Sequence, residues 1–492
     1  MDEQTLVLGP PGTGKTTDLL NKMEQEMANG VAPNRIAFMS FTRKAADEAR
    51  DRAMVKFNFK KGDLPHFGTI HSRAFAQQGL SRDDVMGFGH YKELGRIMSL
   101  NFNPGKSMED GIPDERARGD RYVYLDSYAR ARCISPEDAW HQLTVDDDEF
   151  DWFEFRQFQK TLAIYKKDKG VVDFTDMLEH MAVACSDPGV DVTILDEAQD
   201  LSTLQWRAAR GYLNYAKRTY IGGDDDQAIF TWSGADVNAF LSLPGRRQVL
   251  TQSHRLPISV HRLADTVAHQ ISRRFAKVWR PRPDQGDVQW HNGLESVDLS
   301  SGSWLLLARN THLLAPLVAL VREQGYAYTY RGQSVVKKAH LEAIQGWEAM
   351  RKGKAIPKKI AVTVSSFMPK CKVDPGKMGN REFTMADFQI ERPRIWHETL
   401  TGITEGEREY YVALLRSGES ISKEPRIHIN NIHGVKGGEA DNVLLVPDMA
   451  QKTFSGYQRD ADDEHRVMYV GVTRCRQELH MLAPATSKFY SF

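Results

Sequence analysis

Short runs of apolar residues alternate with amphipathic stretches along the chain. The first run, Thr5–Leu8, has the composition of a buried strand, and after a glycine-rich loop the residues from Thr17 onward follow a helical pattern. Three further apolar runs are found: one at Asp191–Leu195, one that ends at Gly222-Gly223, and one at Trp304–Ala308. Strands that alternate with helices favour α/β domains built on parallel sheets.

The composition narrows the class of protein. The chain has 492 residues, enough for about three or four domains at roughly 150 residues each. Lys and Arg number 65, Asp and Glu also number 65, and 41% of the residues are hydrophobic. This composition is typical of a globular protein and excludes disorder, collagen and coiled coils. No stretch approaches the roughly 20 apolar residues that span a bilayer, so we expect a cytoplasmic protein with no membrane partner.

The loop after the first strand reads G-x-x-x-x-G-K-T between a strand and a helix. Glycines in such a loop let backbone N–H groups surround phosphates at a helix N-terminus. Lys15 would supply positive charge to the β- and γ-phosphates, and the Thr16 hydroxyl can bind Mg²⁺. The sequence therefore predicts a nucleotide-binding loop made of Gly9, Pro10, Pro11, Gly12, Thr13, Gly14, Lys15, Thr16 and Thr17.

Two later strands end in groups that such a loop requires. Asp196 and Glu197 follow one apolar run, where one carboxylate can bind the metal and the other can act on the attacking water. Another run leads to Gln227, which can hydrogen-bond the γ-phosphate or the water, and then to Phe230 and Trp232. These rings could stack on bases of any sequence, although by themselves they fit buried core aromatics better.

Several segments carry a resemblance to a known family. The string Asp196–Asp200, D-E-A-Q-D, resembles the D-E-x-Q-D box of the UvrD/Rep family of superfamily 1 helicases, and Ile221–Ala235 resembles its V-G-D-x-D-Q-S-I-Y-x-W-R-G-A box. The resemblance covers roughly residues 5–80, 160–335 and 425–480. Further segments similar to the family's boxes follow in the family's order: Phe38–Ala46, Thr69–Ser72, Val172–Leu178, Leu250–Arg255, Trp304–Asn310, Tyr328–Gly332, Ile427–Glu439 and His465–Arg476.

The resemblance implies a role for each matching position. Arg255 and Arg474 would face the γ-phosphate as arginine fingers, completing a catalytic set with Lys15, Glu197 and Gln227, while Thr16 and Asp196 would hold Mg²⁺. His254 would stack on the base of the nucleotide, and Glu439 would bind its ribose. For Arg309 an ordinary surface salt bridge stays open. The implied DNA contacts are Phe41, Thr42, Lys44, Thr69, His71, Phe230, Trp232, Arg309, His433 and Lys436.

The family's fold consists of two RecA-like domains of doubly wound parallel sheet, each with a mostly helical insertion. We expect the first domain at residues 1–80 and 160–252 with its insertion at 81–159, and the second at 253–340 and 425–492 with a shortened basic insertion at 341–424. The implied activity is ATP- and Mg²⁺-dependent translocation along single-stranded DNA and unwinding of duplex, with 3′-to-5′ travel. Three alternatives stay open: a motor that does not separate strands, an RNA-directed ATPase, and a non-enzymatic partner with an inactive ATPase fold.

Some features depart from the family. Gln4 is too close to the loop to be the Gln that reads adenine in the family, and His254 replaces the aromatic residue that stacks on adenine, so the choice between ATP and other NTPs is open. The stretch from Arg351 to Arg381 contains nine Lys and Arg and one acid, Asp374. This excess of positive charge fits a patch that contacts duplex DNA and a solvated loop equally well.

The end of the chain and the short second insertion also shape the expectation. The chain ends about eighteen residues past Arg474, so we expect a compact helicase of phage or mobile-element type without a nuclease domain. Such a protein would act as a monomer in a bacterial or phage-infected cell. Its partners would be single-stranded DNA, junctions of single- and double-stranded DNA, and replication or repair proteins.

Overall fold

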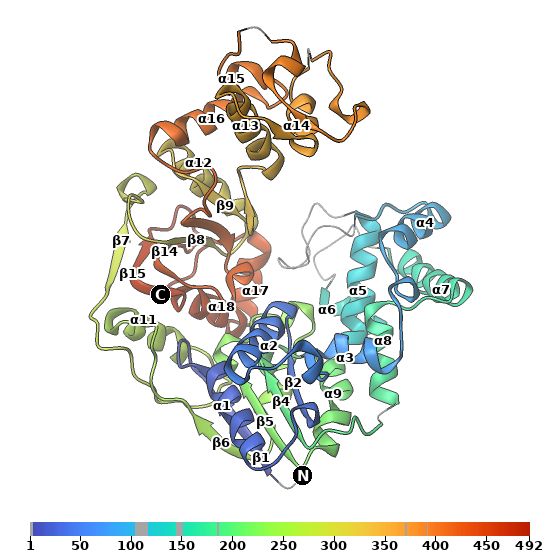
Figure 1. Ribbon diagram of the computed structural model, residues 1–492. Helices are drawn as coiled ribbons and strands as arrows, with labels where there is room; N and C mark the ends of the chain where they lie inside the picture. Colours follow the sequence, from blue (N-terminus) through green and yellow to red (C-terminus); the bar gives the residue numbers. More distant parts are fainter. Residues whose placement is uncertain (1–2, 104–116, 144–150, 185, 370, 391) are drawn as a thin grey trace.

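The computed structural model describes residues 3–103, 117–143, 151–184, 186–369, 371–390 and 392–492. One large sheet lies in each half of the chain, and a helical insertion projects from each half (Figure 1). Among the residues that the structure describes, no helix has the length and apolarity needed to cross a membrane.

The first sheet has the strand order β3-β2-β4-β5-β1-β6, and every neighbouring pair is parallel. The carboxyl ends of β1, β4 and β5 therefore lie side by side at one edge, where ligands of such sheets bind. The strands are β1 (Glu3–Leu8), β2 (Ile36–Ser40), β3 (Phe67–Thr69), β4 (Val192–Asp196), β5 (Arg218–Gly223) and β6 (Arg246–Val249).

Helices cover both faces of the first sheet because successive residues of a strand point to opposite sides. Val7 packs in one layer with α1 (Lys15–Ala28) and α2 (Arg43–Phe57). Its neighbours Leu6 and Leu8 pack in the other layer. Burial on both faces explains the continuous apolar run of the strand. The helices of the second layer are α3 (Ile70–Gln77), α8 (Phe174–Val183), α9 (Thr203–Tyr215) and α10 (Val237–Leu241).

The second sheet has the order β10-β9-β13-β8-β14-β15-β7, in which the β9–β10 pair is antiparallel and the other pairs are parallel. Its strands are β7 (Asp287–His291), β8 (Trp304–Ala308), β9 (Tyr328–Tyr330), β10 (Gln333–Ser334), β13 (Ile427–Asn431), β14 (Ala440–Val446) and β15 (Cys475–Leu482). The α/β fold with parallel sheets that the alternating patterns predict is confirmed.

Two layers of helices also enclose the second sheet. Leu305 and Leu307 pack in one layer and Leu306 in the other. The first of these layers contains α11 (Ile258–His269), α17 (Gln451–Arg459) and α18 (Asp462–Val472), and the second contains α12 (Ala315–Glu323).

The insertion of the first half is a helical unit with its own core. Tyr122, Leu125, Phe155 and Phe158 pack together at its centre. Helix α7 continues past residue 159, where we expected the insertion to end, and its residue Tyr165 still belongs to this core. The helices are α4 (Phe88–Met98), α5 (Arg118–Arg132), α6 (Pro136–Leu143) and α7 (Trp152–Lys169).

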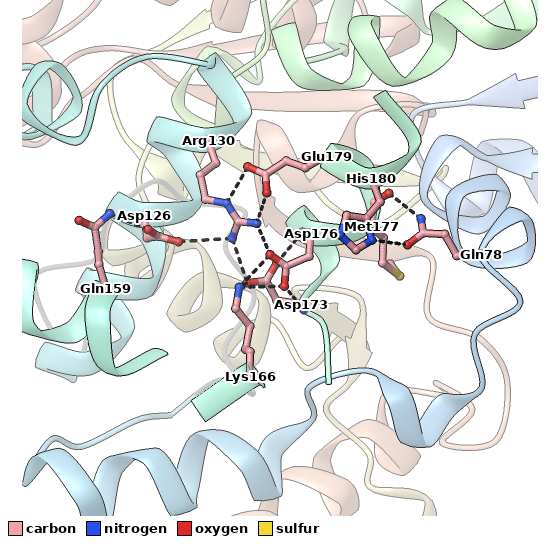
Figure 2. A network of polar contacts seen from close by, with 10 residues as sticks. All are labelled: Gln78, Asp126, Arg130, Gln159, Lys166, Asp173, Asp176, Met177, Glu179 and His180. Carbon is pink, nitrogen blue, oxygen red and sulfur yellow. Dashed lines mark hydrogen bonds and ion pairs between the residues drawn. The ribbon is translucent and has the colours of Figure 1, made fainter. Parts of the chain in front are cut away.

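A network of ion pairs joins this insertion to α8 of the first half (Figure 2). The guanidinium of Arg130, on α5, lies 2.9 Å from Asp173 and 2.7 Å from Glu179, and it also binds Asp176. Lys166, on α7, lies 2.7 Å from Asp173 and 2.8 Å from Asp176. Asp173 and Asp176 also form the capping box at the start of α8, so the same carboxylates begin a helix of the first half and hold the insertion.

The insertion of the second half shares the core of the second sheet. Trp347, Phe383 and Tyr411 lie in one hydrophobic cluster with Leu306 of β8. Its elements are α13 (Lys338–Arg351), β11 (Ile356–Pro357), α14 (Lys358–Ser366), β12 (Glu382–Phe383), α15 (Trp396–Thr399) and α16 (Glu405–Arg416).

The basic stretch from Arg351 to Arg381 lies in this second insertion. Arg351 pairs with Glu348 at 2.7 Å and Arg381 with Asp387 at 2.9 Å, so acids outside the stretch offset part of its charge. Lys370 lies outside the described residues. The interpretation as a solvated loop is wrong for much of the stretch, because β11 and α14 lie in it and Ala361 and Val364 of α14 pack in the core. The duplex-contacting patch stays a prediction.

Candidate nucleotide site and nucleic-acid interface

The glycine-rich loop connects β1 to α1 at the carboxyl edge of the first sheet. The Gly9 amide donates to the Gly223 carbonyl at 3.0 Å, which fixes the loop to the end of β5. Gly14 begins α1 with φ of +76°, and Gly12 has φ of +73°. A Cβ at Gly12 would lie 2.4 Å from the Cβ of Arg255. Only glycine fits there, and the first amides of α1 stay free of side chains, as a phosphate requires.

Lys15 and two carboxylates meet at this edge. The Lys15 ammonium lies 2.6 Å from Glu197 and 3.7 Å from Asp196. Burial lowers the pKa of Lys15, but the charges of Glu197 and Asp196 outweigh burial and the pKa lies above its ordinary value. Burial opposes the charge of Glu197 as well, yet Lys15 and Lys436 hold the pKa of Glu197 down at about 2. Lys15 and Glu197 are therefore both charged at neutral pH.

The residues expected to hold Mg²⁺ lie next to each other. The Thr16 hydroxyl donates to the Asp196 carboxylate at 2.7 Å. Both side chains present oxygen atoms, the ligands that Mg²⁺ prefers. Asp196 is 2% exposed and burial raises its pKa, so a bound cation would stabilise its charged form. The donor set fits the metal.

Glu197 has an unusual backbone conformation. Its φ is +56°, a left-handed value that costs energy for a residue with a Cβ and occurs often at functional sites. The side-chain NH₂ of Gln199 donates to the Glu197 carboxylate at 2.7 Å. The side-chain oxygen of Gln199 accepts from the backbone amide of Asp224 at 3.0 Å. Gln199 thus joins the ends of β4 and β5. We did not identify it from the sequence, although it belongs to the D-E-A-Q-D string and its position between acids was a signal.

The second half of the chain reaches the loop through the segment after β6. The Ser253 hydroxyl donates to the Pro11 carbonyl and the His254 amide donates to the Gly12 carbonyl, both at 2.8 Å. The His254 side chain is exposed beside the loop. Arg255 binds the Glu439 carboxylate and donates to the Thr473 carbonyl at 3.3 Å. His254, Arg255 and Glu439 therefore lie together on the far side of the loop.

Arg474 contacts the first half directly. Its guanidinium is 1% exposed and donates to the Gln227 side-chain oxygen at 2.7 Å. Its other hydrogen bonds go to the Val470 and Gly438 carbonyls and the Thr473 hydroxyl, so within the described part of the chain its hydrogen-bond partners are neutral. Burial and the nearby Arg255 lower the pKa of Arg474 to about 9. A buried cation without an anionic partner fits a site that receives a phosphate.

Four of the expected DNA contacts form one aromatic cluster. The ring of Phe41 lies 5.2 Å from that of Phe230, and Phe230 lies 6.1 Å from Trp232. His433 packs 6.3 Å from both Phe230 and Trp232. Burial holds the pKa of His433 well below its ordinary range, so its ring is neutral at neutral pH. Phe41 and His433 come from different halves, and the cluster therefore spans the two halves.

Lys436 extends the cluster toward the nucleotide site. Its ammonium lies 5.1 Å from the centre of the Phe230 ring and donates to the Gln227 carbonyl at 2.6 Å. It also binds the carboxylate of Asp200, whose pKa burial raises to about 6. Lys436 thus contacts Asp200 of the D-E-A-Q-D string and also Gln227, which precedes Phe230 and Trp232.

Three other expected DNA contacts, which are not part of the aromatic cluster, have structural roles. The Thr42 hydroxyl accepts from the Ala45 amide at 3.1 Å and begins α2, and the Thr69 hydroxyl accepts from the Ser72 amide at 3.2 Å and begins α3. The Arg309 guanidinium lies 2.6 Å from the Glu464 carboxylate. The side chains are 14% and 9% exposed, so Arg309 forms a mostly buried salt bridge and not the surface salt bridge that the sequence left open. Its contact with DNA stays a prediction.

Lys44 and His71 lie outside the aromatic cluster. Lys44 is exposed on the first turn of α2. The His71 ring packs edge-on against Phe174 at 6.2 Å, and burial lowers its pKa to about 4. The structure thus groups Phe41, Phe230, Trp232, His433 and Lys436. The contacts described for Thr42, Thr69, His71 and Arg309 are to other residues.

A phosphate-binding loop and two carboxylates at one edge of a parallel sheet face Arg474, which precedes β15 of the second sheet, and Arg255, which lies in the segment that leads from β6 to α11. This arrangement defines a two-domain P-loop NTPase. The chain belongs to the UvrD/REP helicase family. The sequence model of the UvrD/REP helicase N-terminal domain matches residues 1–247, and that of the UvrD-like helicase C-terminal domain matches residues 411–485. The two sheets are accordingly the RecA-like domains expected from the sequence.

Individual relatives agree with the family. The chain is 26% identical over 257 residues to a "Probable DNA helicase II homolog" of Mycoplasma genitalium, covering 48% of this chain and 35% of the relative. It is 24% identical over 250 residues to "ATP-dependent DNA helicase Rep" of Buchnera aphidicola, covering 48% and 37%. It is 23% identical over 326 residues to "DNA helicase II" of Escherichia coli, covering 60% and 42%. The aligned residues span less than half of each of these relatives.

Proposed function

We propose that the chain is an ATP-dependent DNA helicase that translocates along single-stranded DNA in the 3′-to-5′ direction. The observation that carries the proposal is the position of Gln227 between the two sites. Its side chain contacts Arg474 of the second half, and its carbonyl accepts from Lys436, which also covers the Phe230 ring. One short segment thus connects the nucleotide site to the aromatic cluster.

In the proposed reaction Lys15 and the amides at the start of α1 bind the phosphates of ATP. Thr16 and Asp196 would hold Mg²⁺, which neutralises charge on the phosphate oxygens. Glu197, charged and held by Gln199, orients the attacking water and accepts its proton. Arg474 and Arg255 balance the charge that develops on the γ-phosphoryl group.

Both groups that bind the nucleoside would come from the second half of the chain. His254 would stack on the base and Glu439 would bind the ribose. The exposed position of the His254 ring beside the loop supports this arrangement. We expect nucleotide binding to draw the halves together because each half then supplies part of one site.

Motion along DNA would follow from opening and closing of this interface. Lys436 and Arg474 make their contacts to the first half across it. We propose that Phe41, Phe230, Trp232 and His433 stack on bases, which tolerates any sequence and contributes about 1 to 3 kcal/mol per base. Opening would move His433 of the second half away from Phe41, Phe230 and Trp232 of the first half, and the two halves would then hold and release the strand in alternation.

The test is displacement of a labelled strand from duplexes with a 3′ tail, a 5′ tail or no tail, in the presence of ATP and Mg²⁺. We expect the 3′-tailed duplex alone to open. Lys15→Ala should abolish displacement, and Lys22→Ala, a change on the same helix α1, should leave it intact. A preference for the 5′ tail would refute the polarity. ATP hydrolysis stimulated by single-stranded DNA without displacement would favour a translocase that does not separate strands, and stimulation by RNA alone would favour an RNA-directed ATPase.

A further inference from the structure

Lys277 is a buried cation to which the sections above give no role. Its ammonium lies 2.7 Å from Asp224, 2.5 Å from Asp225 and 2.9 Å from Asp226, and all four side chains are 0% exposed. Lys277 follows α11 in the second half, whereas the three acids follow β5 in the first half. Charges are costly to bury, so this contact between the halves requires an explanation.

The segment that carries Lys277 is inserted into the first half. The Phe275 ring packs 6.0 Å from Phe240 in the core of the first half, and the Phe275 amide donates to Asp225 at 2.7 Å. Arg274 binds both oxygens of Asp226, at 2.8 and 2.7 Å. Three carboxylates thus meet two cations, which leaves the group with one negative charge in excess.

Asp224 links this group to the proposed catalytic residues. One of its oxygens accepts from Lys277, and the other accepts from the Gln227 amide nitrogen at 2.7 Å. The Gln227 oxygen in turn accepts from Arg474 at 2.7 Å. On its other side, the Asp224 amide donates to Gln199, which donates to Glu197. A continuous path of hydrogen bonds therefore runs from Glu197 to Arg474 through Asp224.

The chemistry of these groups sets the orientation of Gln227. A carboxylate only accepts hydrogen bonds and a guanidinium only donates them. Asp224 therefore selects the NH₂ end of the Gln227 amide, and the oxygen must face Arg474. If the amide turned over, its oxygen would face Asp224 and its NH₂ would face Arg474, and both contacts would be lost.

We propose that Lys277 and Asp224 are positioning residues for ATP hydrolysis. Lys277 holds Asp224 in place, and Asp224 fixes the Gln227 amide so that Gln227 and Arg474 meet the γ-phosphate together. This inference rests on the proposed function and names two further residues of the same site. Through Lys277 and Asp224, the second half would therefore control the orientation of Gln227 by a contact that does not involve Arg255 or Arg474.

The test compares Asp224→Asn with Asp226→Asn. Lys277 and Gln227 bind different oxygens of Asp224. An Asn at position 224 replaces one of these oxygens by an NH₂ group, which would face one of the two donors and lose that hydrogen bond. Each variant removes one charge from the same buried group and leaves two carboxylates with two cations. Asp226 makes no hydrogen bond to Gln227 among the described contacts, so Asp226→Asn is the matched control. Lys277→Met is a poorer test because it would leave three buried carboxylates with one cation.

The readout is steady-state ATP hydrolysis at saturating single-stranded DNA. We expect Asp224→Asn to lower kcat by about tenfold or more with little change in the KM for ATP, and Asp226→Asn to stay within about threefold of the wild-type kcat. In a Gln227→Ala background, Asp224→Asn should lower kcat no further, because its effect passes through Gln227. Thermal melting of both variants confirms that they fold alike.

Two results would overturn the inference while the proposed function stands. One is an equal loss of kcat in Asp224→Asn and Asp226→Asn, and the other is an undiminished effect of Asp224→Asn in the Gln227→Ala background. A wild-type protein that hydrolyses no ATP with any DNA would instead refute the proposed function, and this inference with it.

Discussion

Replacing Arg130 by Met should loosen the insertion of the first half from α8. The change leaves Asp173, Asp176 and Glu179 in place and removes the cation that binds all three, so that Lys166 alone neutralises the first two. Breaking a fully buried pair costs about 3 to 5 kcal/mol. The Arg130 side chain is 18% exposed and Lys166 stays, so we expect a loss of about 2 to 3 kcal/mol in the free energy of unfolding.

The assay is thermal unfolding, combined with hydrogen exchange of the amides of α5 and α7. A loss of this size corresponds to a melting temperature lower by about 5 to 10 °C for a unit of 150 to 250 residues. Exchange should accelerate in α5 and α7 while β1 and β5 stay protected. Lys169→Met is the control. Lys169 lies on α7, as Lys166 does, and forms a surface ion pair with Glu93 of α4. Its loss should change the melting temperature by no more than about 1 °C. Equal melting of the two variants would refute the reasoning.

Three other predictions concern the site. Trp232→Ala should raise the concentration of single-stranded DNA that half-saturates ATP hydrolysis by about tenfold, whereas Trp290→Ala, which changes a 60% exposed indole on β7, should not. Arg474→Ala should lower kcat for ATP by about 10³-fold or more, measured at saturating DNA. Burial lowers the pKa of His71 to about 4, so the unfolded chain takes up this proton first and stability is lost as the pH falls from about 6.5 toward 4. His71→Gln should therefore reduce the fall in unfolding free energy between pH 7 and pH 5 by about 2 kcal/mol in denaturant titrations.

The sequence predicts the parts of the site that depend on short stretches of chain. The phosphate-binding loop is defined by a strand, six loop residues and a helix that follow one another, and the structure has them in that order. Asp196 and Gln227 could be placed at one edge because Asp196 ends β4, Gln227 lies in the short segment after β5, and these two parallel strands are neighbours in the sheet. Local pattern and parallel topology were sufficient for these residues.

Contacts between distant residues could not be predicted in the same way. Lys277 stands in a stretch with several other cations that looks like ordinary surface, and its burial depends on acids about fifty residues earlier in the chain. Arg309 has the sequence context of a DNA contact, but its partner Glu464 lies 155 residues away. The partner of Lys277 is set by how the two halves pack. The partner of Arg309 is set by how α18 packs at the end of β8 within the second half. No local pattern encodes either contact.

The phosphate-binding strand also has a particular place in the order of synthesis. β1 lies between β5 and β6, so Glu3 pairs with Arg218 and Leu8 with Val249. A ribosome adds about 210 residues after Leu8 before the first of these partners exists. Even then the three acids after β5 lack their counter-charges until Arg274 and Lys277 have been made. The nascent first domain therefore waits for a segment of the second, and a fragment that ends at residue 252 would have to bury those acids unpaired or leave its core open.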